Sequence, residues 1–281
     1  MRALTSIAEM RGWRTQTRGS VALVPTMGAL HAGHGRLIDC ARQHGASVAV
    51  SIFVNPIQFN QDEDYRRYPR TAENDLAFCD ARGVDLVFQP PVEEMYPQPQ
   101  LTFVEVGRVT DYMEGRFRPG HFRGVATAVL KLLQIVQPER AYFGEKDAQQ
   151  LAVVRRMVKD LNLPVEIVGV PTVREPDGLA LSSRNQHLTA AEREIAPRLY
   201  QALRAAQHCI AAGEICAEVV KRAAIELLAA ESRIRVEYLE VADEDGMQPV
   251  ERITGPVLVA VAAWLGRTRL IDNVRCEHST G

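Results

Sequence analysis

The feature that most constrains this sequence is a short apolar run, residues 21–24, that leads directly into a glycine-rich segment with two histidines. The run is typical of a buried strand in a parallel sheet, and the apolar spacing over 35–44 predicts a helix after it. A strand that turns into a helix presents unpaired N–H groups at the positive end of the helix dipole, which favours an anion. We therefore predict a phosphate site at this turn, where the spacing of His31 and His34 allows both imidazoles to face one oxyanion. The alternative is that the segment holds ordinary turn glycines and two surface histidines.

Predicted strands and helices alternate from Met1 to about Arg174, which favours a parallel sheet with helices on both faces. After Asn185 the order changes, because long helical runs are followed by strands. These later segments predict helices over 189–212 and 214–230, and strands over 234–241, 256–265 and 267–272. We therefore expect an α/β fold with a parallel-sheet domain over 1–176 and a smaller α+β domain over 177–281 that acts as a lid.

Several shorter segments complete the expected first domain. Buried strands are predicted over 47–54, 84–88, 141–144 and 165–170. An alternating pattern predicts one more strand over 101–106, after an irregular proline-rich connection over 90–100. Thr71 is typical of a helix N-cap.

The composition excludes several classes of protein. The chain has 281 residues, 46% of them hydrophobic, and a net charge of -2, which gives no general attraction to nucleic acid or an anionic membrane. Its five cysteines lack zinc-type spacing and fit reduced thiols. The sequence shows neither a signal-peptide core nor an apolar run long enough to span a bilayer. We expect a cytoplasmic protein with no nucleic-acid or membrane partner.

Polar and basic side chains follow two of the predicted elements. Asn55 and Gln58 come directly after the strand over 47–54, where open parallel sheets bind ligands, although Asn-Pro is also an ordinary turn. Arg118 belongs to a basic turn before the helical run 125–136. Such a turn suits a carboxylate or a phosphate, and a solvent-facing loop is the alternative.

Lys146 lies just after the predicted strand over 141–144, at the start of a helix. Its ammonium group would neutralise charge that develops on an attacked α-phosphate. Asp147 would orient a ligand hydroxyl, and Gln150, one helical turn beyond Lys146, would face the same pocket. The alternative is that these residues are only the charged first turn of a helix.

A third polar segment follows the strong turn signal Pro176-Asp177-Gly178. Ser182 and Ser183 supply two hydroxyl groups and Arg184 a guanidinium fork, a set suited to the β- and γ-phosphates of a nucleotide. Serine and asparagine also cap helices, so this segment is equally interpretable as a capping loop.

The histidine segment resembles the HxGH signature of class I adenylyl and nucleotidylyl transferases, and its longer form PTMGALHAGH (25–34) is similar to the pantoate-β-alanine ligase family. The patterns FVNPIQF (53–59), RPGHFRGV (118–125) and GEKDAQQL (144–151) also resemble that family, and the serine-rich loop resembles a degenerate KMSKS loop. The likeness covers nearly the whole chain. It implies a Rossmann-like domain that binds ATP as its Mg²⁺ complex, (R)-pantoate and β-alanine, and a homodimer.

The resemblance also implies roles for individual residues. It places His34, as proton donor, with His31 and Lys146 in catalysis. The residues it assigns to ATP are Met27, Gly28, Ala29, Leu30, His31, Ala32, Gly33, His34, Gly144, Glu145, Lys146, Asp147, Val173, Leu181, Ser182, Ser183 and Arg184. Those assigned to the other substrates are Pro25, Thr26, Asn55, Gln58, Arg118 and Gln150. The metal ligands are left open; family members often carry a second acid beside Asp75, where this chain has Asn74.

The implied activity is ATP-dependent condensation of pantoate with β-alanine through a pantoyl-adenylate, with release of AMP and pyrophosphate. The alternative is a nucleotidylyltransferase of the same superfamily, which would release a nucleotidylated product and no AMP. An aminoacyl-tRNA synthetase would need a basic tRNA-binding surface, for which the C-terminal part of the sequence gives no signal. A non-catalytic nucleotide-binding regulator would be expected to lack His34 or Lys146, and both are present.

Overall fold

The computed structural model describes residues 1–277, which divide into two compact units. The first unit comprises Met1–Val106, Arg118–Glu145 and Val153–Pro171. The second unit comprises Gly107–Phe117, Lys146–Ala152 and the chain from Thr172 onward. The domain boundary expected between 176 and 177 stays a prediction.

Within the described residues, the first unit is built on a parallel sheet of six strands in the order β1-β4-β3-β2-β5-β6. The strands are β1 Arg2–Leu4, β2 Val21–Thr26, β3 Ser47–Ile52, β4 Leu86–Phe88, β5 Arg140–Gly144 and β6 Glu166–Val170. The predicted α/β architecture with a parallel sheet is therefore confirmed.

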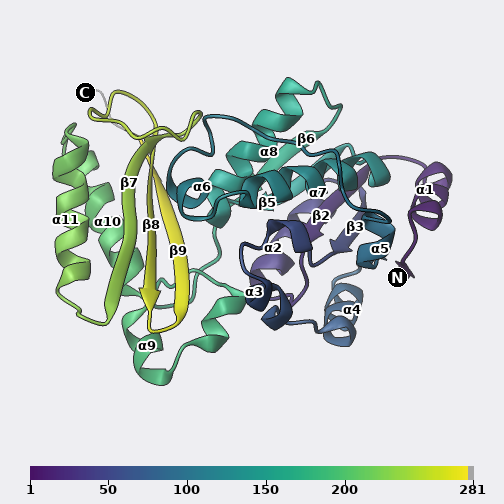
Figure 1. Ribbon diagram of the computed structural model, residues 1–281, viewed down its shortest axis with the longest axis horizontal. Coiled ribbons are helices and arrows are strands. Elements are labelled where there is room, and N and C mark those ends of the chain that lie inside the picture. The colour runs from purple at the N-terminus through teal and green to yellow at the C-terminus, as the bar shows by residue number, and fades with distance from the viewer. Residues whose placement is uncertain (278–281) are drawn as a thin grey trace. The chain divides into compact units, whose positions relative to one another are not determined.

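Helices cover both faces of this sheet (Figure 1). Alternate strand side chains point to opposite faces, so Ala22 and Val24 of β2 pack with Ile38 of α2 and Cys79 of α4. Helix α7 packs against β2 and α1 with its buried side chains outside that cluster, and so covers the opposite face. The helices of the first unit are α1 Ile7–Gln16, α2 Ala32–Gln43, η1 Pro56–Gln58, α3 Asp62–Arg67, α4 Ala72–Ala81, α5 Val92–Met95 and α7 His121–Val136. The helices η2 Glu145–Asp147 and α8 Ala148–Asp160 have residues in both units.

The strand predicted over 101–106 is wrong. This segment forms no ladder, because its backbone and side chains are bound by α7 instead. The Val104 N–H donates to the Thr127 hydroxyl at 3.0 Å, and the Arg123 guanidinium lies 3.8 Å from the centre of the Phe103 ring. An alternating pattern alone does not supply the neighbouring strand that a ladder needs.

The second unit contains the antiparallel sheet β7-β8-β9, with α10 and α11 packed on it (Figure 1). Its strands are β7 Ile234–Asp243, β8 Val257–Leu265 and β9 Thr268–Cys276. Its helices are α6 Met113–Phe117, η3 Ser183–His187, α9 Ala190–Ile195, α10 Arg198–Ala211 and α11 Ala217–Ala229. Small residues such as Ala202 and Ala206 let α10 approach the sheet closely, and the expected α+β composition of this region is confirmed.

The prediction of one long helix over 189–212 is wrong in one respect. It is divided into α9 and α10 at Pro197, which has no N–H to continue the hydrogen bonds of a helix.

Helix α6 contacts the sheet of the same unit, because the carboxylate of Glu114 accepts hydrogen bonds from Arg269 on β9 and from the hydroxyl of Tyr238 on β7. Among residues 1–277, no helix has the length and apolarity to cross a membrane.

Candidate active site

The two histidines lie in a turn over residues 27–34, which we call the histidine turn, between β2 and α2. His31 is the N-cap residue of α2, and its Nδ1 accepts from the Gly33 N–H at 3.1 Å. The N–H of His31 in turn donates to Nδ1 of His34 at 3.2 Å. The ring centroids are 4.2 Å apart. Both imidazoles are therefore fixed by the first turn of the helix.

This arrangement sets which nitrogen of each ring carries the proton. Nδ1 of His31 and Nδ1 of His34 both accept a backbone hydrogen bond, so each neutral ring holds its proton on Nε2. Two Nε2–H donors at the positive end of a helix are suited to bind phosphate oxygens.

The histidine turn is also held by a buried carboxylate on α4. Asp75 is 2% exposed and accepts from the N–H groups of Ala29 and Leu30, at 3.0 and 2.8 Å. The Thr71 hydroxyl donates to the same carboxylate at 3.1 Å, so Thr71 occupies the N-cap position but caps no backbone group. Gly28 has a φ of +83°, and a Cβ there would lie 2.9 Å from Asp75 Oδ2. The Asp75 carboxylate therefore stabilises the conformation of the turn through these hydrogen bonds.

The turn lies where the strand order reverses. The chain proceeds from β2 to β3 and β4 on one side and then crosses to β5 and β6 on the other. Open parallel sheets bind ligands at the carboxyl ends of strands beside such a point. Strand β2 ends at Thr26, before the histidine turn, and β5 ends at Gly144, before Glu145.

Asn55 and Gln58 follow the neighbouring strand β3 and are joined to each other. The Asn55 amide nitrogen donates to Gln58 Oε1 at 3.0 Å and to the Gly124 carbonyl at 3.1 Å, and Asn55 Oδ1 accepts from the Tyr96 hydroxyl at 2.9 Å. Burial raises the pKa of Tyr96, which keeps that hydroxyl protonated. These bonds leave the Gln58 amide nitrogen as the polar group directed away from Asn55, and it lies 2.8 Å from the sulfur of Met27.

Arg118 is connected to the same group through His121. An Arg118 guanidinium nitrogen lies 3.1 Å from His121 Nε2, and His121 Nδ1 lies 2.8 Å from the Gln58 carbonyl oxygen. A guanidinium can only donate, so His121 accepts at Nε2 and donates from Nδ1. The basic turn is thereby coupled to Gln58 within the first unit.

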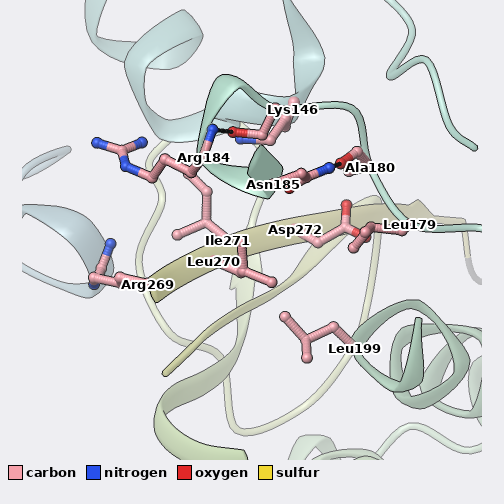
Figure 2. Close-up of a pocket in the computed structure, with 11 residues that line it drawn as sticks. Lys146, Leu179, Ala180, Arg184, Asn185, Leu199, Arg269, Leu270, Ile271 and Asp272 are labelled. Carbon is pink, nitrogen blue, oxygen red and sulfur yellow. Dashed lines mark hydrogen bonds between the residues drawn. The ribbon is translucent and has the colours of Figure 1, made fainter. Parts of the chain in front are cut away.

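In the second unit, Lys146 lines a pocket with Ser182, Arg184, Asn185 and Asp272 (Figure 2). We call it the lysine pocket. The carbonyl of Lys146 accepts from Asn273 Nδ2 at 2.8 Å. The pocket therefore collects a lysine, an arginine and a serine hydroxyl from two segments far apart in sequence.

The serine and arginine of this pocket follow a hairpin over residues 173–181. Its limbs are joined by the bridge between Arg174 and Ala180 and by the Leu181 N–H, which donates to the Val173 carbonyl at 2.9 Å. Ser182 then caps η3, with its hydroxyl accepting from the Arg184 N–H at 3.2 Å. The expected capping interpretation therefore holds for Ser182 beside its place in the pocket.

The remaining predicted residues are distributed over both units. Gly144 and Glu145 belong to the first unit, whereas Lys146, Asp147 and Gln150 belong to the second. Asp147 is exposed and Gln150 is half-buried. The pocket expected to be shared by Gln58 and Gln150 stays a prediction, as do the roles implied for the individual residues.

Sequence reasoning missed several residues that shape these sites. They are Tyr96, His121, Arg174, Asp272 and Asn273, together with the role of Asp75 as a backbone acceptor. His121 lies inside a basic motif that stands out for its arginines, so a signal existed. Asp272 is the last residue of the strand predicted over 267–272 and Asn273 follows it, and nothing in their local sequence indicates their partners.

Within residues 1–277, no group of three or more His, Cys, Asp or Glu side chains is arranged to hold a metal ion. The carboxylate of Asp75, beside which family members often carry a second acid, accepts hydrogen bonds from two N–H groups and a hydroxyl.

The sequence model of pantoate-beta-alanine ligase matches residues 2–275. The chain belongs to the pantoate-beta-alanine ligase family. The family prediction is therefore confirmed. A bifunctional pantoate ligase/cytidylate kinase of Synechococcus elongatus is 53% identical over 280 residues, which are 99% of this chain and 53% of that protein. The chain thus spans about half the length of that relative.

Two solved structures share the fold. Pantothenate synthetase from Thermus thermophilus is 49% identical, with a TM-score of 0.93 over 98% of this chain and 99% of that one. Pantoate-beta-alanine ligase from Francisella tularensis, complexed with beta-gamma ATP and beta-alanine, is 34% identical, with a TM-score of 0.81 over 100% of this chain and 99% of that one.

Proposed function

We propose that this chain condenses (R)-pantoate with β-alanine at the expense of ATP, giving pantothenate, AMP and pyrophosphate. Family membership supports the reaction, and the ligands named for the Francisella tularensis structure are consistent with ATP and β-alanine as substrates. The observation that carries the proposal is the histidine turn, which presents two Nε2–H donors at the strand-order reversal of a parallel sheet.

In the first step, a pantoate carboxylate oxygen attacks the α-phosphorus of ATP in line, and the bond to the bridging oxygen breaks to release pyrophosphate. The Nε2–H groups of His31 and His34 donate to phosphate oxygens, with His34 proposed as the proton donor to the leaving group. Lys146 balances the charge that develops on the α-phosphate, and Ser182 and Arg184 bind the departing pyrophosphate.

In the second step, the amine of β-alanine attacks the acyl carbon of pantoyl-adenylate. The carbon–oxygen bond to AMP breaks, the amide forms, and the amine loses its proton to solvent. No covalent enzyme intermediate is required, because the nucleotide carries the activated acyl group.

The pantoate site is proposed to include Gln58 and Gln150, each offering an amide to a hydroxyl or carboxylate. Pro25 and Thr26, at the end of β2, are proposed to line the same site. Arg118 is proposed to act on Gln58 through His121. Asn55 has both amide hydrogens and its oxygen bound inside the protein, so its proposed part is to orient Gln58.

Three further proposals concern the setting of the reaction. Mg²⁺ enters with ATP as part of the substrate and neutralises phosphate charge there. The protein acts in the cytoplasm and forms a homodimer. Light scattering of the purified protein tests the dimer directly, and a mass of one chain at micromolar concentration would contradict it.

The decisive experiment is isotope exchange between pyrophosphate and ATP. We expect exchange that depends on pantoate and needs no β-alanine, because the adenylate forms before the amine reacts. AMP should accumulate only when both pantoate and β-alanine are supplied. A nucleotidylyltransferase would instead give a nucleotidylated product without AMP. Absence of pantoate-dependent exchange, under conditions in which ATP binds, would refute the adenylate mechanism.

A further inference from the structure

Two consecutive residues of β9, Asp272 and Asn273, bind the two segments that form the lysine pocket. They are 5% and 8% exposed, and both lie in the second unit with those segments. Asp272 itself lines the pocket together with Lys146 and Arg184 (Figure 2). The strand therefore contacts both the lysine segment and the hairpin over 173–181.

Asp272 holds the hairpin through Arg174. Its two carboxylate oxygens accept from the two terminal guanidinium nitrogens of Arg174 at 2.6 and 2.9 Å. Arg174 also donates to the Gly178 carbonyl at 3.1 Å and stacks 3.8 Å from the centre of the Tyr200 ring. A bidentate pair of this kind fixes direction as well as distance, so the hairpin leading to Ser182 has one defined path.

Asn273 holds the lysine segment. Its own backbone is fixed, because its N–H donates to Asp272 Oδ1 at 2.8 Å and its carbonyl accepts from Arg174 at 3.2 Å. From that fixed point its side chain donates to the Lys146 carbonyl at 2.8 Å. A lysine ammonium sits on a long flexible stem, so its position depends on how well the backbone beneath it is held.

We propose that Asn273 is a positioning residue for Lys146 and that Asp272, through Arg174, fixes the hairpin over 173–181 that leads to Ser182 and Arg184 at the same pocket. One strand thereby aligns the ammonium that faces the α-phosphate with the groups that receive pyrophosphate. The inference rests on the function proposed above for Lys146. It assigns to the C-terminal strand a direct influence on the adenylation step.

A double-mutant cycle with Lys146 tests this proposal. We expect Asn273→Ala to lower kcat for pantoate-dependent exchange by about 10- to 100-fold, because small displacements of catalytic groups cost rates of this order, while KM for pantoate changes by less than about threefold. In the Lys146→Ala background the same change should cost less than about threefold, since there is no ammonium left to position. Single-turnover measurements at high enzyme concentration keep the slow variants measurable.

Gln207→Ala is the matched control, because Gln207 donates an amide hydrogen bond at 3.1 Å to a backbone carbonyl of the same strand, that of Arg275, outside the pocket. It should leave kcat within about twofold. Equal losses from Asn273→Ala in both backgrounds would overturn the positioning role. If Asn273→Ala fails to fold, Asn273→Ser goes through the same cycle. Absence of exchange in the unmodified protein would instead refute the proposed function, and this inference with it.

Discussion

The histidine turn and the lysine pocket both present donors suited to phosphate, but different kinds of contact hold them. In the histidine turn, each imidazole is fixed by a backbone N–H two or three positions away. In the lysine pocket, the carbonyl of Lys146 is held by a side chain 127 positions further along the chain. The first site is formed by local sequence with one distant support, Asp75, and the second depends on the completed antiparallel sheet.

The largest expected effect concerns the charge in the lysine pocket. Lys146→Ala should lower kcat by about 1000-fold, about 4 kcal/mol of transition-state stabilisation, because the developing α-phosphate charge loses its cation. Steady-state AMP formation measures this, with the thermal midpoint as a check on folding. Lys159→Ala removes an exposed lysine from α8 and serves as the control. Activity within about tenfold of the unmodified protein would show that Lys146 is not the main charge stabiliser.

Asp75 supports the histidine turn from a distant part of the sequence. Its replacement therefore tests whether local hydrogen bonds are enough to hold the turn. Asp75→Asn replaces one acceptor oxygen by an NH₂ group facing backbone N–H groups. We expect kcat/KM for ATP to fall by about 100-fold and the free energy of unfolding by about 2 kcal/mol. Asp80→Asn, on the exposed part of α4, is the control. Unchanged ATP kinetics would mean that the turn keeps its shape without the carboxylate.

Replacing His31 separates its structural and chemical contributions. Asparagine can cap a helix but has no donor equivalent to Nε2, whereas alanine lacks both. We expect His31→Asn and His31→Ala each to lower kcat by about 30-fold, about 2 kcal/mol, and only His31→Ala to lower the free energy of unfolding by about 1 kcal/mol. Urea titrations and exchange rates measured on the same preparations distinguish the two. Equal stability of both variants would contradict the capping role.

The smallest effect is a pH dependence at Cys79, which lies on α4 with Asp75. Burial, and then the neighbouring Asp75 charge, raises the pKa of the Cys79 thiol from its ordinary value near 9 to about 12. The unfolded chain ionises first, so this contribution to stability is complete below pH 9 and is lost as the pH rises towards 12. At pH 10 the loss is about 1.4 kcal/mol.

Urea unfolding at pH 7.5 and pH 10 measures this loss. Cys79→Ala should show a smaller alkaline decrease in the free energy of unfolding than the unmodified protein. Cys216→Ala, which changes an exposed cysteine, should show the same alkaline decrease as the unmodified protein. Identical alkaline decreases in all three proteins would place the titrating group elsewhere.

The contrast between the two sites also explains how far the sequence alone can be interpreted. The strand, turn and helix around His31 and His34 were predictable, because apolar spacing and turn residues act over a few positions. The break at Pro197 was missed by the prediction of one helix over 189–212, although a proline inside a helical run is a local signal. The conformation of residues 101–106 was not predictable, because it depends on the hydrogen bond to Thr127 in α7 rather than on the alternating apolar pattern of the segment. Nor were Asp272 and Asn273, whose partners lie 98 and 127 positions away.

The hydrogen bonds from two backbone amides to the imidazoles make those amides sensitive to the protonation and orientation of the histidines. The amide hydrogens of His31 and Gly33 each point at an imidazole nitrogen rather than at an oxygen. Protonation of either ring at Nδ1, or rotation of the ring as it binds an anion, would release the amide bound to it. The hydrogen-exchange rates and chemical shifts of these two amides therefore follow the state of the histidines directly, with neither a label nor a substitution in the site.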